Sequence, residues 1–242
     1  PRHINDLTKT EREKALRSIT LVTQKRDGRI KGRTVADGRK QRDYISKEDI
    51  TSPTVSTEAL MISLAIDAHE ARHVATADVE GAYLHADMDE TVIMMFEGDM
   101  VEYMIQANPE YIPYVHVSRN NKKMIYVELL KALYGCMQSA LLWFELLTST
   151  LKELGFKINP YDKCVANKDI EGHQCTICWY VDDLKISHKA KQVVEDIIKE
   201  IEERYGKMTV THGIKHTYVG MDISFSQPKH VRITMIDYLQ AV

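Results

Sequence analysis

The chain has 242 residues, of which 44% are hydrophobic and 28% are charged, and its formal net charge at pH 7 is −3. This is the composition of an ordinary globular protein that is large enough to bury a core. No apolar stretch is long enough to span a bilayer, which excludes a membrane-spanning protein and predicts no membrane partner. The first residue is Pro1, without a signal-peptide pattern, and we expect that the chain is excised from a longer polypeptide.

The basic residues are concentrated near the N-terminus, although the net charge is slightly acidic. Between residues 25 and 42 only Asp27 and Asp37 oppose the basic side chains. Such a stretch is compatible with binding nucleic-acid phosphates, or it is a solvated hairpin whose lysines prevent edge pairing. Its members are Lys25, Arg26, Arg29, Lys31, Arg33, Arg39, Lys40 and Arg42.

The chain has four cysteines, Cys136, Cys164, Cys175 and Cys178. Cys175 and Cys178 have the spacing of half a zinc knuckle, but no second such pair exists. In a strand, residues three apart face opposite sides, which suits neither chelation nor a disulfide. We therefore expect reduced thiols in an intracellular protein.

Hydrophobic periodicity and turn residues predict short helices and strands throughout the first half of the chain. Asp27-Gly28 is a strong hairpin signal between the first two strands. The expected elements are a helix at 7–18, strands at 19–23 and 29–35, a helix at 55–70, and strands at 73–79, 92–96 and 126–130.

The second half alternates strands and helices around a central hairpin. Its elements are a helix at 139–154, strands on either side of residues 180–183, a helix at 190–205, and strands at 207–211, 217–225 and 231–235. The order of the central part of the chain is strand, helix, strand, strand, helix, strand, with an antiparallel hairpin in the middle, and it predicts a split βαβ arrangement.

Two adjacent carboxylates end an apolar strand, in Tyr180-Val181-Asp182-Asp183. Such a pair is costly unless it is solvated, paired or bound to cations, yet aspartates also suit ordinary hairpin turns. On this tetrapeptide alone a tight turn and a metal site are equally good interpretations. The split βαβ order places the end of the strand at 73–79 beside this hairpin, so we expect Asp78 to approach Asp182 and Asp183. Taken alone, Asp78 would be a strand-end cap.

Five segments follow one another in the order of one protein family. They are Lys31-Gly32-Arg33-Thr34-Val35-Ala36, Asp78-Val79-Glu80-Gly81-Ala82-Tyr83-Leu84, Lys131-Ala132-Leu133-Tyr134-Gly135-Cys136-Met137-Gln138-Ser139, Tyr180-Val181-Asp182-Asp183 and Tyr218-Val219-Gly220-Met221-Asp222-Ile223. They resemble Lys-Ala-Arg-Leu-Val-Ala, Asp-Val-Lys-Thr-Ala-Phe-Leu, Lys-Ala-Leu-Tyr-Gly-Leu-Lys-Gln-Ser, the catalytic tetrapeptide and Phe-Leu-Gly-Ile-Glu-Ile of the reverse transcriptase of copia-type (Ty1-like) LTR retrotransposons. The resemblance extends over about residues 19–240.

The resemblance implies an α+β, right-hand polymerase fold with fingers and palm and with a thumb that has barely begun. The implied ranges are fingers at 1–72 and 98–137, palm at 73–97 and 138–225, and the start of the thumb connection at 226–242.

The resemblance also implies RNA-directed and DNA-directed DNA synthesis, in which a primer 3′-hydroxyl attacks the α-phosphorus of a dNTP. Two Mg²⁺ or Mn²⁺ ions would assist this attack. Asp78, Asp182 and Asp183 would be the catalytic residues. Asp78 and Asp182 would bridge the ions, the Val79 carbonyl would bind the triphosphate-side ion, and Asp183 would support them.

The resemblance implies a nucleotide site in which Tyr83 excludes a ribose 2′-hydroxyl; taken alone, a tyrosine here is more often core packing. Lys31 and Arg33 are candidates to hold the triphosphate, or they are solvated strand residues. The further substrate candidates are Gly81, Ala82, Tyr134, Gly135, Gln138 and Ser139, of which Ser139 is equally well a helix cap.

The expected partners are an RNA or DNA template with its primer, and dNTPs. Gly220 and Met221 would form a hairpin that steadies the primer end, or a bulge in a small sheet. The further candidates for nucleic-acid contact are Tyr180, Val181 and Val219. We also expect RNase H and integrase segments of the same polyprotein as possible partners. The expected location is the cytoplasm, or a virus-like particle.

Two departures from the family pattern lie after Gly135. Cys136-Met137 stand where the family has Leu-Lys, and Ala140-Leu141 stand where it has Pro-Arg. The loss of the usual Lys at Met137, together with the missing thumb, motivates an alternative, a catalytically weak domain that binds nucleic acid or protein. A third hypothesis, an unrelated Mg²⁺ phosphohydrolase, explains the three aspartates but neither the basic stretch nor Tyr83.

Overall fold

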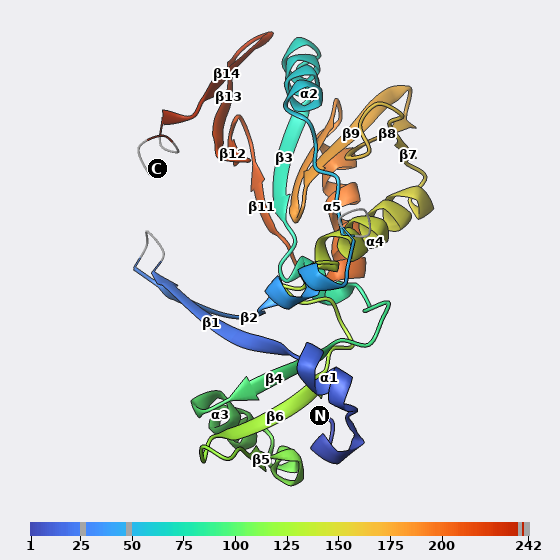
Figure 1. The fold of residues 1–242 in the computed structure, drawn as a ribbon. Helices are drawn as coiled ribbons and strands as arrows, with labels where there is room; N and C mark the ends of the chain where they lie inside the picture. Colours follow the sequence, from blue (N-terminus) through green and yellow to red (C-terminus); the bar gives the residue numbers. More distant parts are fainter. Residues whose placement is uncertain (25–27, 47–49, 237–238, 240–242) are drawn as a thin grey trace. The chain divides into compact units, whose positions relative to one another are not determined.

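The computed structural model describes residues 1–24, 28–46, 50–236 and 239, and it is an α+β protein, as expected (Figure 1). The chain divides into two compact units. Unit 1 comprises Pro1–Thr51 and Tyr83–Trp143, and unit 2 comprises Ser52–Ala82 and Phe144–Val242. Each unit is described separately below.

Unit 1 is built on a five-stranded sheet with the order β2-β1-β4-β6-β5. Its strands are β1 (Leu16–Gln24), β2 (Ile30–Ala36), β4 (Ile93–Glu97), β5 (His116–Val117) and β6 (Lys123–Glu128). Its helices are η1 (Ile4–Asp6), α1 (Lys9–Lys14), η2 (Gly38–Asp43), α3 (Asp99–Ala107) and η4 (Pro109–Tyr114), and η3 (Ala82–His85) begins at the boundary between the units. Strands β1 and β2 form the long blue hairpin of Figure 1.

The hairpin expected near the N-terminus is confirmed, with β1 and β2 paired antiparallel from Gln24–Ile30 to Ser18–Ala36. Asp27, half of the hairpin signal, lies outside the described residues, as do Lys25 and Arg26 of the basic stretch. Gly28 has φ +82°, which a glycine adopts without strain.

The helix expected at 7–18 is too long. Helix α1 begins with a capping box between Thr8 and Glu11 and ends at Lys14. Leu16 already belongs to β1, where it pairs with Met94 of β4 and is fully buried. Burial of Leu16 in the sheet therefore overrides the local helical pattern.

Strand β4 of unit 1 has an apolar core on each of its faces. On one face Met94 packs with Leu16 and Ala36, and on the other its neighbour Ile93 packs with Leu7. Successive strand residues point to opposite faces, so β4 contributes to two cores. The middle of the unit 1 sheet is thus covered on both sides, whereas most of β1 and β2 is exposed.

Unit 2 contains a six-stranded sheet with the order β11-β3-β10-β9-β8-β7 and a small sheet with the order β12-β13-β14. The strands are β3 (His73–Asp78), β7 (Lys157–Ile158), β8 (Val165–Ile170), β9 (His173–Tyr180), β10 (Asp183–His188), β11 (Thr209–His212), β12 (Lys215–Tyr218), β13 (Met221–Gln227) and β14 (His230–Thr234). The helices are α2 (Thr57–His69), α4 (Ser139–Glu153), whose first turn belongs to unit 1, and α5 (Lys191–Tyr205).

The split βαβ prediction is confirmed. In chain order β3, α4, β9, β10, α5 and β11 alternate as expected, and β10 inserts between β3 and β9 in the sheet. All three of these pairings, β11 with β3, β3 with β10 and β10 with β9, are antiparallel. The hairpin β9–β10 therefore lies in the middle of the sheet, beside β3 (Figure 1).

Several element boundaries differ from those expected. The single strand expected at 217–225 is two strands, because Val219 and Gly220 both have positive φ, 49° and 71°, and make a two-residue hairpin turn. Helix α3 and strand β8 were not expected. Helix α3 has only nine residues and buries only Val101.

Two segments pack in a different unit from the one that the implied ranges suggest. Helix α2 lies within the range 1–72 but belongs to unit 2, where Asp67 forms a buried ion pair with Lys185 of β10. Strand β4 lies within the range 73–97 but belongs to unit 1, where it pairs with β1 and β6. Long-range pairing, which local sequence does not encode, decides both placements.

Candidate active site

Three aspartates meet at one end of the unit 2 sheet. Asp78 is the last residue of β3 and Asp183 is the first residue of β10, and the two are direct partners in the antiparallel register. Asp182 lies in the adjoining turn, where its carbonyl accepts a hydrogen bond of 3.1 Å from the Val79 N–H. The approach expected from the split βαβ order is therefore present.

The charges of these aspartates interact. The pKa of Asp183 is raised to about 6, first by burial and then by the negative charges of Asp182 and Asp78. Like charges held this close disfavour the ionised form. A cation would relieve that repulsion, and carboxylate oxygens are ligands that Mg²⁺ prefers.

The donor set therefore fits a divalent ion in type. Among the described residues, however, no group of three His, Cys, Asp or Glu side chains forms a complete metal site. The expected ligands lie close together where β3 ends and β10 begins, but their side chains do not enclose a metal ion.

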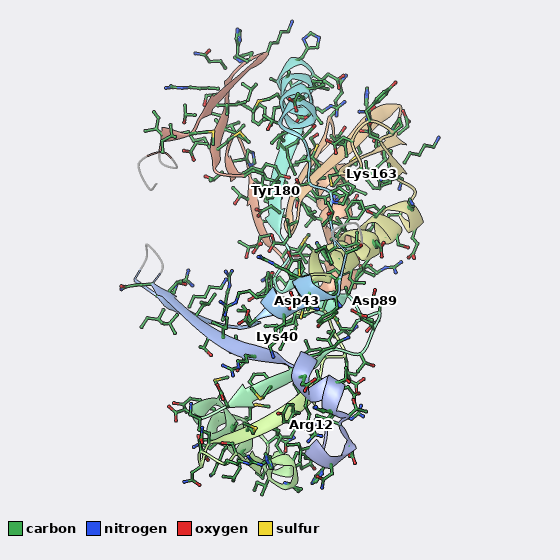
Figure 2. All side chains as sticks on the ribbon, viewed as in Figure 1. Arg12, Lys40, Asp43, Asp89, Lys163 and Tyr180 are labelled. Atoms are coloured by element: carbon green, nitrogen blue, oxygen red, sulfur yellow. The ribbon has the colours of Figure 1, made fainter. Side chains whose placement is uncertain are left out.

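The turn between β9 and β10 is strained. Tyr180 and Asp183 pair across it, which leaves Val181 and Asp182 as its two central residues. Val181 has φ +57°, a conformation that is uncommon for a β-branched residue and that costs about 1–3 kcal/mol. A glycine at this position would remove the cost. Because the chain has Val181 instead, the surrounding structure must hold the turn in this conformation. Tyr180, labelled in Figure 2, is partly exposed beside the turn.

The segment after Asp78 turns sharply. Gly81 has φ +66°, and the Ala82 N–H donates to the Val79 carbonyl at 3.3 Å. That carbonyl is the expected metal ligand, and it keeps a second lone pair. Val79 and Ala82 are buried.

In unit 1 the structure brings together three of the residues expected at the nucleotide. The rings of Tyr83 and Tyr134 have centroids 4.3 Å apart. The Arg33 guanidinium lies 5.9 Å from the centroid of the Tyr134 ring, within the range of a cation–π contact. Lys31 lies two residues before Arg33 on β2 and shares its face.

A close backbone approach fixes Tyr134 against the end of β2. The Ala36 N–H donates to the Tyr134 carbonyl at 2.8 Å. Gly135 has φ +94°, and a Cβ atom there would lie 1.9 Å from the Ala36 carbonyl oxygen. A Cβ atom on Gly38 would lie 2.1 Å from the Gly135 oxygen. Only glycine therefore fits at positions 38 and 135, where the loop that contains Tyr134 crosses the end of β2.

Gln138 and Ser139 form hydrogen bonds that hold the loop containing Tyr134. Both are buried. The side-chain carbonyl of Gln138 accepts a hydrogen bond from the side-chain amide of Gln41 at 2.7 Å. The side-chain amide of Gln138 donates to the Glu90 carboxylate at 2.9 Å. The Ser139 hydroxyl donates to the Leu133 carbonyl at 2.8 Å. Their side chains are thus engaged within unit 1.

Part of the basic stretch is neutralised and part is exposed. Arg39 forms a 2.6 Å ion pair with Asp37, and hydrogen bonding from Arg39 is the main cause that lowers the pKa of Asp37 to about 2. Arg33 and Lys31 are exposed on β2. Lys40, labelled in Figure 2, donates to the Glu13 carbonyl at 2.9 Å.

The hairpin expected at the primer end is formed by β12 and β13, with Val219 and Gly220 in its turn. The Met221 side chain is buried. Any contact of this hairpin with nucleic acid is therefore left to its backbone, to the two turn residues and to exposed side chains such as Lys215 and Thr217.

Two important residues were not anticipated from the sequence. Lys185 is fully buried and ion-paired with Asp67, two residues after Asp183. Tyr218 is buried and donates toward carbonyls of the aspartate hairpin. A lysine between Leu184 and Ile186 in an apolar strand requires a buried partner, and this signal was available in the sequence.

The four cysteines are buried and free, as expected. Burial raises the pKa of the Cys136 thiol to about 11 and those of Cys164 and Cys175 to about 12, and it raises that of Cys178 as well. In the described part of the chain, no helix has the length and apolarity needed to cross a bilayer.

The family model described as "Reverse transcriptase (RNA-dependent DNA polymerase)" matches residues 6–242 of this chain. The Transposon Ty1-BL and Ty1-BR Gag-Pol polyproteins of Saccharomyces cerevisiae are each 28% identical to it over 236 residues. The match covers 95% of this chain and 12% of each polyprotein, so the chain spans about an eighth of the length of these relatives.

Two solved structures are similar in part. The foamy viral protease-reverse transcriptase dRH in complex with double-stranded DNA matches 93% of this chain and 32% of its own, with a TM-score of 0.45 and 13% identity. The telomerase from Candida albicans matches 95% of this chain and 48% of its own, with a TM-score of 0.46 and 10% identity. Since the family model matches nearly the whole length of the sequence, the chain belongs to the reverse transcriptase (RNA-dependent DNA polymerase) family.

Proposed function

We propose that this chain extends a primer on an RNA or DNA template by adding dNTPs, as part of a copia-type retrotransposon polyprotein. The observation that supports this best is the register of Asp78 with Asp183, with Asp182 in the adjoining turn, in a chain of the reverse transcriptase family. The sheet of unit 2 is the palm in this proposal, and unit 1 is the larger part of the fingers.

Asp78 and Asp182 are the proposed bridging ligands of two Mg²⁺ or Mn²⁺ ions, with the Val79 carbonyl as a further ligand. When bound, the ions supply activation of the primer hydroxyl and stabilisation of the leaving pyrophosphate. Asp183 supports this set; burial and then the charges of Asp182 and Asp78 raise its pKa, and bound ions would offset that repulsion. The strained Val181 turn presents Asp182 at the sheet edge.

Tyr83 is the proposed sugar-discriminating residue, and its stacking on Tyr134 supports a fixed ring position. Arg33 and Lys31 are the proposed triphosphate contacts, since both are exposed on one face of β2. Tyr134 and Gly135 border the nucleotide in this proposal. Gln138 and Ser139 act indirectly, by holding the loop.

The β12–β13 turn and Tyr180 are the proposed contacts of template and primer in unit 2, together with exposed basic residues of unit 1. By the same inference the chain works with RNase H and integrase segments of its polyprotein, in the cytoplasm or a virus-like particle.

Primer extension on an RNA template, with Mg²⁺ or Mn²⁺, tests the proposal. We expect template-directed products from the unmodified chain and none above background from Asp182→Asn. Asp196→Asn is the matched control, because this exposed carboxylate lies on α5, away from the three aspartates. Equal dNTP incorporation by the unmodified chain and Asp182→Asn would refute the catalytic assignment.

The same assay separates the alternatives. Phosphate release from a simple monoester, without primer or template, would favour a phosphohydrolase. Binding of primer–template without extension would favour the weak binding domain. That alternative is motivated by Met137, whose family counterpart is a lysine and whose backbone N–H donates to Gln41 here.

A further inference from the structure

Tyr218 joins the small sheet of unit 2 to the aspartate hairpin. It is the last residue of β12, and only 3% of it is exposed. Its hydroxyl lies 3.3 Å from the Cys178 carbonyl oxygen and 3.2 Å from the Asp183 carbonyl oxygen. The phenol therefore points at the hairpin from a neighbouring sheet.

The two carbonyls belong to the two strands on either side of the aspartate turn. Cys178 lies on β9 and Asp183 begins β10, so the single hydroxyl proton of Tyr218 is shared between carbonyls of the two strands. These strands are already paired with each other, and β10 is also paired with β3. The added constraint acts on the last pairs of the hairpin, from Asp183 at the end of the ladder to Cys178, which pairs with Lys185 inside it.

That end of the hairpin is the part that needs support. Val181 has φ +57° in the turn, and such a strained conformation persists only when its surroundings over-determine it. Asp78, Asp182 and Asp183 are crowded beside it and repel one another. Strain and repulsion both favour opening of the turn, and the Tyr218 hydrogen bonds oppose it.

The hydroxyl is suited to this role at all working pH values. Burial raises the pKa of Tyr218 well above its usual 10, so the phenol remains a donor. A ring alone fills the space between the sheets, whereas the hydroxyl adds the directional bonds.

We propose that Tyr218 is a positioning residue for DNA synthesis, whose hydroxyl holds the β9–β10 turn in place and couples it to the β12–β13 hairpin. This inference rests on the proposed polymerase function. The expected consequence is that the chemical step, rather than dNTP binding, depends on the hydroxyl, since small displacements of reacting groups lower the rate.

The test is Tyr218→Phe in the 242-residue chain, which removes one oxygen atom and keeps the ring. Loss of these bonds is expected to lower kcat about 3- to 10-fold, with the KM for dNTP changed less than about twofold. Hydrogen–deuterium exchange of the Val181, Asp182 and Asp183 amides is expected to become faster.

Tyr205→Phe is the matched control. Tyr205 is also a buried tyrosine, but it ends α5, and its hydroxyl pairs at 2.5 Å with Thr150 of α4 rather than with the β9–β10 hairpin. We expect this variant to keep the kcat of the unmodified chain and to leave exchange at the aspartate turn unchanged.

Unchanged kcat and unchanged exchange at the turn in Tyr218→Phe would overturn the proposal, as would equal effects of the two phenylalanine variants. The proposed function fails separately: in that case the unmodified chain makes no template-directed product. The exchange measurement still decides, without any polymerase activity, whether the hydroxyl holds the turn.

Discussion

Asp78 and Asp183 lie directly opposite each other on neighbouring antiparallel strands, β3 and β10. Between them in sequence lie most of unit 1, helix α4 and the hairpin strand β9. Holding two like charges side by side lowers the stability of the sheet, and such destabilising arrangements are typical of functional sites.

Asp183→Asn is therefore expected to stabilise the metal-free chain while abolishing primer extension. Asparagine removes a charge that is disfavoured by burial and by Asp78 and Asp182, and the expected gain in free energy of unfolding at pH 7 is about 1 kcal/mol. Urea unfolding in the presence of EDTA measures it. Asp196→Asn, on the exposed face of α5, is expected to change neither quantity, and a less stable Asp183→Asn chain would contradict the prediction.

Tyr83→Ala is expected to raise ribonucleotide incorporation relative to dNTP incorporation. Tyr134→Ala is expected to act in the same direction but less strongly, because the Tyr134 ring packs against Tyr83 at 4.3 Å. Single-nucleotide extension with matched rNTP and dNTP measures the ratio. Tyr103→Ala, at an exposed tyrosine on α3, is the control. An unchanged ratio in Tyr83→Ala would leave that tyrosine a packing residue.

The sequence predicted the part of the fold that depends on element order. Alternation of strands and helices was sufficient to expect the split βαβ sheet, and that topology alone predicts the approach of Asp78 to Asp182. Helix ends with strong local chemistry were also predictable, as with Gly206 after α5.

The sequence did not predict features that depend on distant partners. Leu16 belongs to a strand because Met94 pairs with it, and α2 belongs to unit 2 through Asp67. The hydrogen bonds of the buried Gln138 side chain were likewise not predictable, because Gln41 and Glu90 become its partners only in the folded unit.

Gly135→Ala is expected to destabilise the chain by about 2–4 kcal/mol, because its Cβ atom would meet the Ala36 carbonyl and its φ is +94°. Gly32→Ala is the control, since a Cβ atom there meets nothing within 4 Å. Thermal unfolding of the two variants makes the comparison. Equal melting temperatures would show that the crossing of the loop over β2 is looser than described.

The cysteines are expected to react slowly with a thiol reagent such as DTNB in the folded chain at pH 8. Burial raises the pKa of Cys136 to about 11 and that of Cys175 to about 12, so little thiolate is present and access is poor. All four thiols should react within the mixing time in urea. Rapid reaction of a thiol in the folded chain would contradict this burial.

Lys185→Met is expected to destabilise the chain by about 3–5 kcal/mol, because it leaves the Asp67 carboxylate buried without its closest cationic partner. Arg72 offers only partial compensation, with its guanidinium 3.9 Å from Asp67 and engaged at 2.9 Å by Glu70. Urea unfolding measures the loss.

The double variant Lys185→Met with Asp67→Leu is expected to recover most of that stability, since an apolar pair of similar volume can replace a buried ion pair at little cost. Additive losses in the two single variants and the double variant would contradict a direct pair. Because Lys185 lies two residues after Asp183 on β10, the double variant also shows whether DNA synthesis needs the ion pair or only a filled core. We expect extension by the double variant close to that of the unmodified chain, since its strand register with β3 is kept by backbone pairing.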